Sequence, residues 1–163
     1  MTDLRSDDGV DAAVRKLPVG SGVIFRHYHL PDAERFALFR RIARICRSRG
    51  HVLVLAGRND WSADGVHGRP RVRPHQILTM PVHSVTEIRR AQALGADLVF
   101  LSPLFPTRSH PGARALGIMQ FSRLAKITGG TKVIALGGMT RSKAQAITRR
   151  VAYGWAAIDA FTR

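Results

Sequence analysis

Seven short apolar runs, separated by segments with helical spacing, constrain the fold of this chain more than any other feature. The runs are rich in Val, Ile and Leu, which is typical of strands buried on both faces of a parallel sheet. The segments 32–49, 85–94, from about 118 and from 140 favour helices, and Ser84 with Glu87 has the spacing of a capping box. We expect strands at 22–30, 51–57, 63–68, 77–83, 96–103, 132–138 and 153–161.

This alternation predicts an α/β fold of the (β/α) barrel type, in which chemistry gathers where the strands end. Two features depart from a complete barrel. The chain has 163 residues, whereas a barrel of this type needs roughly 200 or more. The segment between Gly57 and Ala63 is also too short for a helical crossover, which takes about a dozen residues. We therefore expect a single domain, residues 1–163, in which one helix is reduced to a loop.

The charge is strongly basic, with 26 Lys and Arg against 11 Asp and Glu, for a formal net charge of +15. Such a surface attracts anions, including phosphorylated metabolites and nucleic acid, although solvated arginines are the plain alternative. No nucleic-acid-binding motif occurs, and no segment interleaves aromatic residues with the basic ones. Nucleic acid is therefore the weaker of the two partner hypotheses.

The single cysteine, Cys46, lies on the apolar side of an expected helix, so we interpret it as core filler in a reducing compartment. No apolar run approaches the ~20 residues of a membrane span, and the acidic N-terminus has no apolar leader. These features predict a cytoplasmic protein that does not cross a membrane. The sequence leaves the oligomeric state open.

The stretch FLSPLFPTRSHPGARALG, residues 100–117, is the most informative part of the sequence. It follows an apolar run, crosses a turn with two prolines, and presents Thr107, Arg108, Ser109 and His110 in succession. Hydroxyls and cations together suit an anion, so this loop either binds a phosphorylated substrate or only has the outline of a loop that does.

Residues 82–161 resemble the thiamine phosphate synthase family, which includes the TenI-like thiazole tautomerases. The matching pieces are VHSVTEIRRAQALGADLVFLSPLFPT, HPGARALG, VIALGGMT and AYGWAAIDAF, in the order and spacing of the family's fifth to eighth strands. A weaker match runs through GVIFRHY, LVLAGR and ADGVHG. The resemblance implies a (β/α)8 barrel, and residues 1–3 look like the tail of its first strand, so the barrel is expected to be truncated there.

The resemblance also implies an activity. Synthases of the family couple an aminopyrimidine pyrophosphate to thiazole phosphate and release pyrophosphate with Mg²⁺ as cofactor. Departure of pyrophosphate leaves a pyrimidine carbocation, so cations, hydroxyl donors and a metal are needed to stabilise the charge. The implied partner is thus a small phosphorylated metabolite of the thiazole phosphate or pyrophosphate type.

The family's metal ligands are not retained. Residues 56–57, Ala-Gly, stand where the family has Asn-Asp, and Asn59-Asp60 just beyond either reaches the site or forms an ordinary turn. No carboxylate occurs in 65–86, and His27 and His29 have no acidic or Cys partner at a zinc-site spacing. We therefore expect no metal site. Arginines fill the gap, as a phosphate site or a solvated loop, at Arg69, Arg71 and Arg73.

Two histidines are the candidate catalytic residues by the resemblance. His83 matches the histidine that shuttles a proton in the tautomerase branch, a role that suits a pKa near neutrality, or it is a structural histidine. His110 replaces the lysine that meets pyrophosphate, while Thr107 and Ser109 keep two hydroxyl donors. Arg26 matches an arginine of the second strand, where it contacts an anion or forms a structural ion pair.

The remaining candidates for phosphate binding lie after the last two strands: Gly137, Gly138, Ile158 and Asp159. Glycine lets backbone N–H groups approach a phosphate, although a tight turn needs it equally. Asp159 replaces a serine of the family, and its carboxylate would repel phosphate unless it is protonated or paired, with Arg26 as one candidate partner.

Three hypotheses follow for the function. The first is the family's coupling reaction with a degenerate metal and pyrophosphate site. The second is a metal-free, thiazole tautomerase-like isomerase that depends on His83. The third is a non-catalytic barrel that binds a phosphorylated ligand or RNA.

Overall fold

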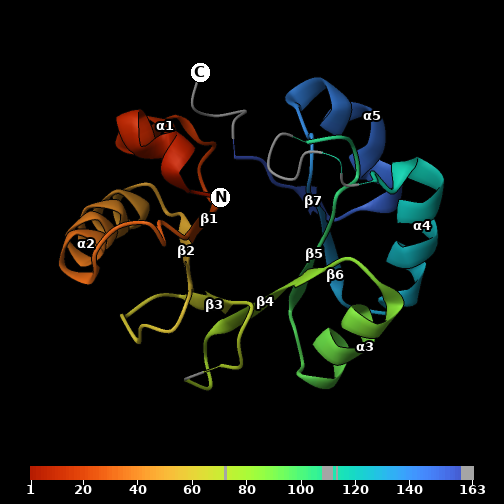
Figure 1. Cartoon of the computed structure of the whole chain (residues 1–163), viewed down its shortest axis with the longest axis horizontal. Coiled ribbons are helices and arrows are strands. Elements are labelled where there is room, and N and C mark those ends of the chain that lie inside the picture. Colours follow the sequence, from red (N-terminus) through yellow and green to blue (C-terminus); the bar gives the residue numbers. More distant parts are fainter. Residues whose placement is uncertain (72, 108–111, 113, 159–163) are drawn as a thin grey trace. The chain divides into compact units, whose positions relative to one another are not determined.

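The computed structural model describes residues 1–71, 73–107, 112 and 114–158. The chain divides into two compact units, one comprising Met1–Ile77 with Ile158–Arg163 and the other Leu78–Ala157 (Figure 1). We describe each unit by itself, and the single domain expected from the sequence stays a prediction.

The first unit is built on three parallel strands. They are β1 (Gly22–Phe25), β2 (Val52–Ala56) and β3 (Gly65–His67), in the order in which they occur along the chain. β1 pairs with β2 through Gly22 opposite Val52, and β2 pairs with β3 through Val54 opposite Gly65. Residues 57–64 join β2 to β3 without a helix, which confirms that the crossover is reduced to a loop.

Helix α2 (Asp32–Ser48) covers the strands of the first unit, and its buried side chains enter the core of that unit. Its apolar positions recur every three or four residues, which is why one face packs inward and the other stays in solvent. Cys46 lies on the packed face, as predicted, and burial followed by the proximity of Asp64 raises the pKa of its thiol to about 11. The other buried contributors include Phe25, Leu38, Phe39, Ile42, Ile45, Leu53 and Leu55.

The N-terminal segment contains two elements that the sequence analysis did not assign. A 3-10 helix, η1 (Leu4–Gly9), leads into α1 (Val10–Lys16), which packs against the core through Val10 and Val14. Before them, the Thr2 N–H donates to the Ile24 carbonyl at 2.9 Å. Thr2 therefore lies beside β1, as a residue of a neighbouring strand would.

The second unit alternates strands and helices regularly. Its elements are β4 (Ile77–Val82), α3 (Val85–Ala93), β5 (Leu98–Leu101), α4 (Gly117–Ile127), β6 (Lys132–Ala135), α5 (Arg141–Val151) and β7 (Gly154–Trp155). The pairs β4–β5, β5–β6 and β6–β7 are all parallel. Figure 1 shows α3, α4 and α5 following one another along one side of these strands.

Two aspartates, each placed just before a strand, bind that strand's start to the preceding strand in the same way. The Asp64 N–H donates to the Leu53 carbonyl, and its Oδ2 accepts from the Leu53 N–H at 2.7 Å. Asp97 makes the same pair of bonds with Leu78, again with 2.7 Å between Oδ2 and the amide nitrogen. One carboxylate in each unit is thus used for strand pairing.

The predicted capping box at the start of α3 is present in a modified form. The Ser84 hydroxyl accepts from the Glu87 N–H at 3.3 Å. The Glu87 carboxylate accepts from the His83 N–H at 2.6 Å, one residue before the position that a standard capping box uses. Glu87 therefore also fixes the backbone at a candidate catalytic residue.

Two strands are shorter than expected. β1 ends at Phe25 rather than residue 30, because His27 has a φ of 38° and the Leu30 N–H turns back to the His27 carbonyl. β7 covers only two residues of the expected 153–161, although the Ala156 N–H still donates to the Ala135 carbonyl. No helix within the described residues is long and apolar enough to cross a membrane.

Candidate functional site

Arg26 and His67 lie at the carboxyl ends of β1 and β3 in the first unit. Arg26 is half-buried, and its guanidinium carbon lies 5.6 Å from the centroid of the Tyr28 ring. His67 is buried, and burial followed by the positive charge of Arg26 lowers the pKa of its imidazole to about 4. The sequence analysis did not single out His67. The anion contact expected of Arg26 stays a prediction.

Asp7 binds the two histidines that the zinc hypothesis had considered. His29 Nε2 lies 2.8 Å from Asp7 Oδ2, and His27 Nε2 lies 3.0 Å from Asp7 Oδ1 without hydrogen-bond geometry. His27 Nδ1 lies 2.9 Å from the Thr2 hydroxyl. Burial lowers the pKa of His27, and this effect is larger than the opposite effect of the Asp7 carboxylate, which raises it. Across the described ranges, no group of three or more His, Cys, Asp and Glu side chains could hold a metal ion.

Arg35 is a buried cation of α2 whose side chain reaches the ends of two strands. Its Nε donates to the Arg26 carbonyl at 2.9 Å and one terminal nitrogen donates to the Ala56 carbonyl at 2.7 Å. The other terminal nitrogen donates to Asn59 Oδ1. Burial lowers the pKa of Arg35. One guanidinium thus joins the segments that follow β1 and β2.

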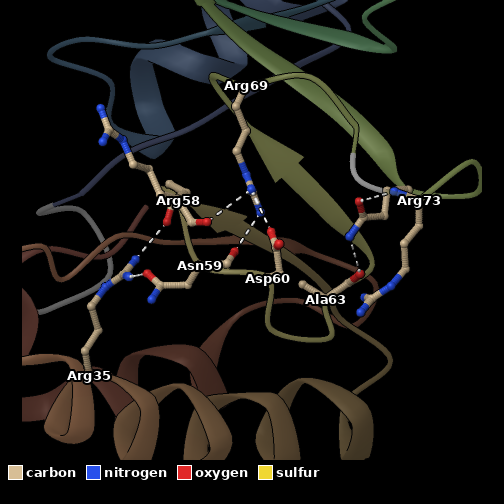
Figure 2. A network of polar contacts seen from close by, with 9 residues as sticks. Arg35, Arg58, Asn59, Asp60, Ala63, Arg69 and Arg73 are labelled. Carbon is tan, nitrogen blue, oxygen red and sulfur yellow. Dashed lines mark hydrogen bonds and ion pairs between the residues drawn. The ribbon is translucent and has the colours of Figure 1, made fainter.

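Arg69 approaches the same segment from the loop after β3 (Figure 2). Its terminal nitrogens donate to Asp60 Oδ1 at 2.9 Å and to the Asn59 carbonyl at 2.7 Å. Figure 2 shows Arg35 and Arg69 reaching residues 58–60 from two sides. Both functional groups of the Asn59-Asp60 pair are therefore bound by arginine.

These contacts decide whether the residues present fit the Mg²⁺ that the family resemblance implies. A magnesium ion takes carboxylate and other oxygen ligands in a near-octahedral arrangement. Here Asn59 Oδ1 and Asp60 Oδ1 each accept from a guanidinium, whose positive charge would oppose a nearby divalent cation. The Asn59-Asp60 pair does not fit a Mg²⁺ site.

The other arginines of this loop also make contacts within the loop. Arg71 Nε donates to the Gln76 carbonyl at 2.8 Å, and the Arg73 N–H donates to Gln76 Oε1 at 3.1 Å. Gln76 in turn donates to the Ala63 carbonyl at 3.4 Å. These bonds favour a structural role for Arg71, whereas the contact of Arg73 is made by its backbone and leaves the role of its exposed side chain open.

His83 follows β4 in the second unit and its imidazole is exposed. Its Nδ1 lies 2.7 Å from the Ser102 carbonyl oxygen and 3.3 Å from the Ser102 hydroxyl. A carbonyl oxygen can only accept, so Nδ1 carries a proton, and in the neutral imidazole the lone pair is on Nε2. The imidazole is thus oriented by its neighbour and presents a basic nitrogen.

The loop after β5 packs directly on the glycines after β6. The Leu104 N–H donates to the Leu136 carbonyl at 2.8 Å and the Phe105 N–H to the Gly137 carbonyl at 3.1 Å. A Cβ on Gly137 would lie 2.7 Å from Pro103 Cα, and one on Gly138 would lie 2.5 Å from the Pro106 carbonyl oxygen. Both glycines are therefore required by packing, whatever they bind.

Lys143 supplies a cation next to this glycine loop. Its Nζ donates to the Gly138 carbonyl at 3.0 Å and lies 4.6 Å from the centroid of the Phe105 ring. Thr140 caps the start of α5 by accepting from the Lys143 N–H at 3.3 Å. A lysine, a glycine turn and a helix start form a suitable surface for a phosphate group.

The structure places the remaining expected residues only in part. Thr107 is half-buried at the end of the described part of its loop, and Ile158 is half-buried beyond β7. Ser109, His110 and Asp159 lie outside the described residues. The catalytic role of His110 stays a prediction. So does phosphate binding by the other candidates, which are Thr107, Ser109, Gly137, Gly138, Ile158 and Asp159.

Three contacts were missed by sequence reasoning. Arg35 falls on the apolar face of α2, one turn before Phe39, and a charge at such a position is a signal that could have been used. Ser102 orients His83 through its backbone, which no side-chain pattern reveals. Lys143 was overlooked because it lies beyond the glycines, within the expected helix.

Known proteins resemble this chain over most of its length. Residues 3–161 match the family model described as thiamine monophosphate synthase. The thiamine-phosphate synthase of Geobacillus thermodenitrificans is 32% identical over 147 residues, which cover 80% of this chain and 66% of that protein. The thiamine-phosphate synthase of Chlorobium luteolum is 31% identical over 170 residues, covering 94% and 80% of the two chains.

A solved structure resembles the fold. The thiamine phosphate pyrophosphorylase from Pyrococcus furiosus aligns with a TM-score of 0.83 and 22% identity, covering 99% of this chain and 85% of that one. This likeness confirms the α/β fold of the barrel type that the sequence predicted. From the match over residues 3–161, we conclude that the chain belongs to the thiamine monophosphate synthase family.

Proposed function

We propose that the chain binds a phosphorylated thiazole-type metabolite and moves a proton on it with His83, without a metal ion. One observation carries this proposal, namely the 2.7 Å contact between His83 Nδ1 and the Ser102 carbonyl. It holds the imidazole in the tautomer whose Nε2 accepts a proton, and the side chain is exposed to an incoming ligand.

The proton transfer needs no second reactant. His83 Nε2 accepts a proton from a carbon next to the thiazole ring, which leaves the electron pair in the ring system, and the imidazolium returns the proton to another atom of the same molecule. The substrate and product are thus isomers. The Ser102 carbonyl accepts from Nδ1–H throughout and stabilises the imidazolium that forms.

The phosphate of the substrate is assigned to the glycine loop after β6. Gly137 and Gly138 keep the backbone close to the loop 103–106, and Lys143 places a fixed positive charge beside them. A lysine retains its charge across the pH range in which a histidine such as His110 loses it. Lys143 therefore supports phosphate binding where the family's lysine has been replaced.

The family's coupling reaction is the second candidate. It is supported by membership of the family and by the retained glycines, but it requires stabilisation of a departing pyrophosphate. The guanidinium groups of Arg35 and Arg69 bind the Asn59 amide and the Asp60 carboxylate. In the sequence these two residues lie just beyond the position at which the family resemblance implies metal ligands. The proposed isomerisation therefore uses no Mg²⁺. We propose the cytoplasm as its location.

Deuterium incorporation tests the proposal. A thiazole phosphate is incubated with the protein in D₂O containing EDTA, and loss of the exchangeable C–H signal is followed by NMR. We expect exchange with the wild type, a loss of about 10²-fold or more in His83→Asn, and an unchanged rate in His75→Asn, an exposed histidine elsewhere.

Two results would contradict this function. One is full exchange by the His83→Asn variant, which would show that His83 is not the base. The other is release of pyrophosphate from an aminopyrimidine pyrophosphate and thiazole phosphate that depends on added Mg²⁺, which would assign the coupling reaction instead. Binding of thiazole phosphate without either reaction would leave only the non-catalytic hypothesis.

A further inference from the structure

A stripe of three arginines runs along the solvent face of α2. Positions 36, 40, 44 and 47 are four, four and three residues apart, so Phe36 and the three arginines lie on one face of the helix. All four are exposed, and at 1.5 Å per residue they extend over about 16 Å. We call Arg40, Arg44 and Arg47 the arginine stripe.

Nothing in the neighbouring sequence neutralises the arginine stripe. No acidic residue occurs between Glu34 and Asp60, and Asp32 lies at the opposite end of the helix from Arg47. Asp11 of α1 is 2.9 Å from Arg41, which is beside the stripe rather than on it. Like charges three and four residues apart destabilise a helix, and a bound polyanion would remove this repulsion.

The N-terminal end of the arginine stripe joins a group of aromatic rings from three segments. Phe36 and Trp61 have ring centroids 5.0 Å apart, and the Arg40 guanidinium carbon lies 6.0 Å from the Phe36 centroid. Arg35 lies 5.0 Å from the Trp61 centroid and 5.4 Å from that of Tyr28. Tyr28 is 56% exposed and Phe36 is 40% exposed. We call Tyr28, Phe36 and Trp61 the aromatic end.

The sequence alone did not show this arrangement. Aromatic and basic residues alternate over short stretches at 25–28 and 35–41, but only folding brings the residues after β1, the N-terminal part of α2 and the loop after β2 together. The result joins the exposed rings of Tyr28 and Phe36 and the half-buried ring of Trp61 to the guanidinium groups of the arginine stripe, all within the first unit.

We propose that this surface binds single-stranded nucleic acid, with bases against the aromatic end and phosphates along the arginine stripe. Unpaired bases stack on aromatic rings without regard to sequence, while arginine binds phosphate in a fixed fork geometry. A duplex keeps its bases stacked internally and would use only the arginines. An anionic membrane is a poorer fit, because the apolar face of α2 is packed in the core and cannot insert.

Fluorescence anisotropy with a labelled 20-nucleotide RNA of mixed sequence tests this surface in the full-length protein. The RNA is used alone and after annealing to its complement, and anionic vesicles are the competing ligand. The test variant is Arg40→Gln/Arg44→Gln/Arg47→Gln. The matched control, Arg15→Gln/Arg89→Gln/Arg123→Gln, removes the same charge from three exposed positions on other helices.

We expect the arginine stripe variant to bind the single strand at least about tenfold more weakly, while the control changes less than threefold. Each lost phosphate contact should lower the slope of log affinity against log salt by about 0.7, or about 2 for three contacts. Phe36→Leu should weaken binding to the single strand and leave duplex binding unchanged.

Equal loss in the two triple variants would overturn the proposal, since it would mean attraction to net charge alone. Tighter binding to the duplex than to the single strand, or displacement of RNA by anionic vesicles, would also overturn it. Circular dichroism spectra of the variants serve as the control that the Arg→Gln changes leave the fold intact. The proposal does not depend on the isomerase function, because a His83→Asn variant should bind RNA as the wild type does.

Discussion

Acidification should destabilise this protein through one buried histidine. The pKa of His67 is about 4 in the folded chain, below its ordinary 6.5, because burial and then the charge of Arg26 oppose protonation. Between these two values the unfolded chain binds a proton that the folded chain does not. The free energy of unfolding therefore falls as the pH is lowered from about 6.5 towards 4. The stabilisation that is lost in this range is fully present at neutral pH, where His67 is neutral in both states.

The magnitude follows from the two pKa values. They differ by about 2.5 pH units, and 1.36 kcal/mol per unit gives about 3 kcal/mol as the largest contribution of this one group. Replacement by glutamine removes the titration but keeps a polar side chain of similar reach. The difference in free energy of unfolding between wild type and His67→Gln should therefore shrink by about 2–3 kcal/mol between pH 7.5 and 4.5.

Urea unfolding at a series of pH values, monitored by tryptophan fluorescence, measures this difference. The matched control is His75→Gln, an exposed histidine in the same unit, for which the difference from wild type should stay within about 0.5 kcal/mol. Parallel curves for wild type and His67→Gln would refute the reasoning. If His67→Gln does not fold, NMR titration of the wild type still decides, because the His67 ring signals should not move between pH 8 and 5.

Two further substitutions test the packing and the arginine contacts by urea unfolding at neutral pH. Gly137→Ala should cost about 3 kcal/mol or more, since φ is +95° and the new Cβ would lie 2.7 Å from Pro103 Cα, whereas Gly130→Ala, with no atom within 4 Å, should change stability little. Arg35→Lys should cost about 2–4 kcal/mol, because an ammonium cannot serve the Arg26, Ala56 and Asn59 oxygens in the same geometry, whereas exposed Arg44→Lys should be near neutral. Equal stability of either variant and its control would contradict the corresponding contact.

Local patterns in the sequence were enough to order the secondary structure from β1 onward, but they missed η1 and α1. The capping residues Ser84 and Glu87 are three apart, so their contact depends on one helix turn and could be predicted. The seven expected strands all occur, as does the loop that replaces a helix after β2. Strand ends were harder, because the turn at His27 coincides with contacts to Thr2 and Asp7, which are distant in the sequence.

The candidate site was less accessible to sequence reasoning for the same reason. His83 could be selected by resemblance, but its tautomer depends on the Ser102 carbonyl, 19 positions away. Asn59 was open to either a metal or a turn role until Arg35, 24 positions away, was found on its side-chain oxygen. Long-range polar contacts leave no periodic signal, so patterns do not predict them.

The paired bonds of Asp64 and Asp97 have a consequence for how the strands find their alignment. A parallel strand that slips by one residue turns every side chain to the wrong face. Here a slip of β3 along β2 would also separate the Asp64 carboxylate from the Leu53 N–H, and a slip of β5 along β4 would do the same for Asp97 and Leu78. Each unit therefore has its own side-chain contact that forms only in the native register, and this contact lies at the beginning of a strand.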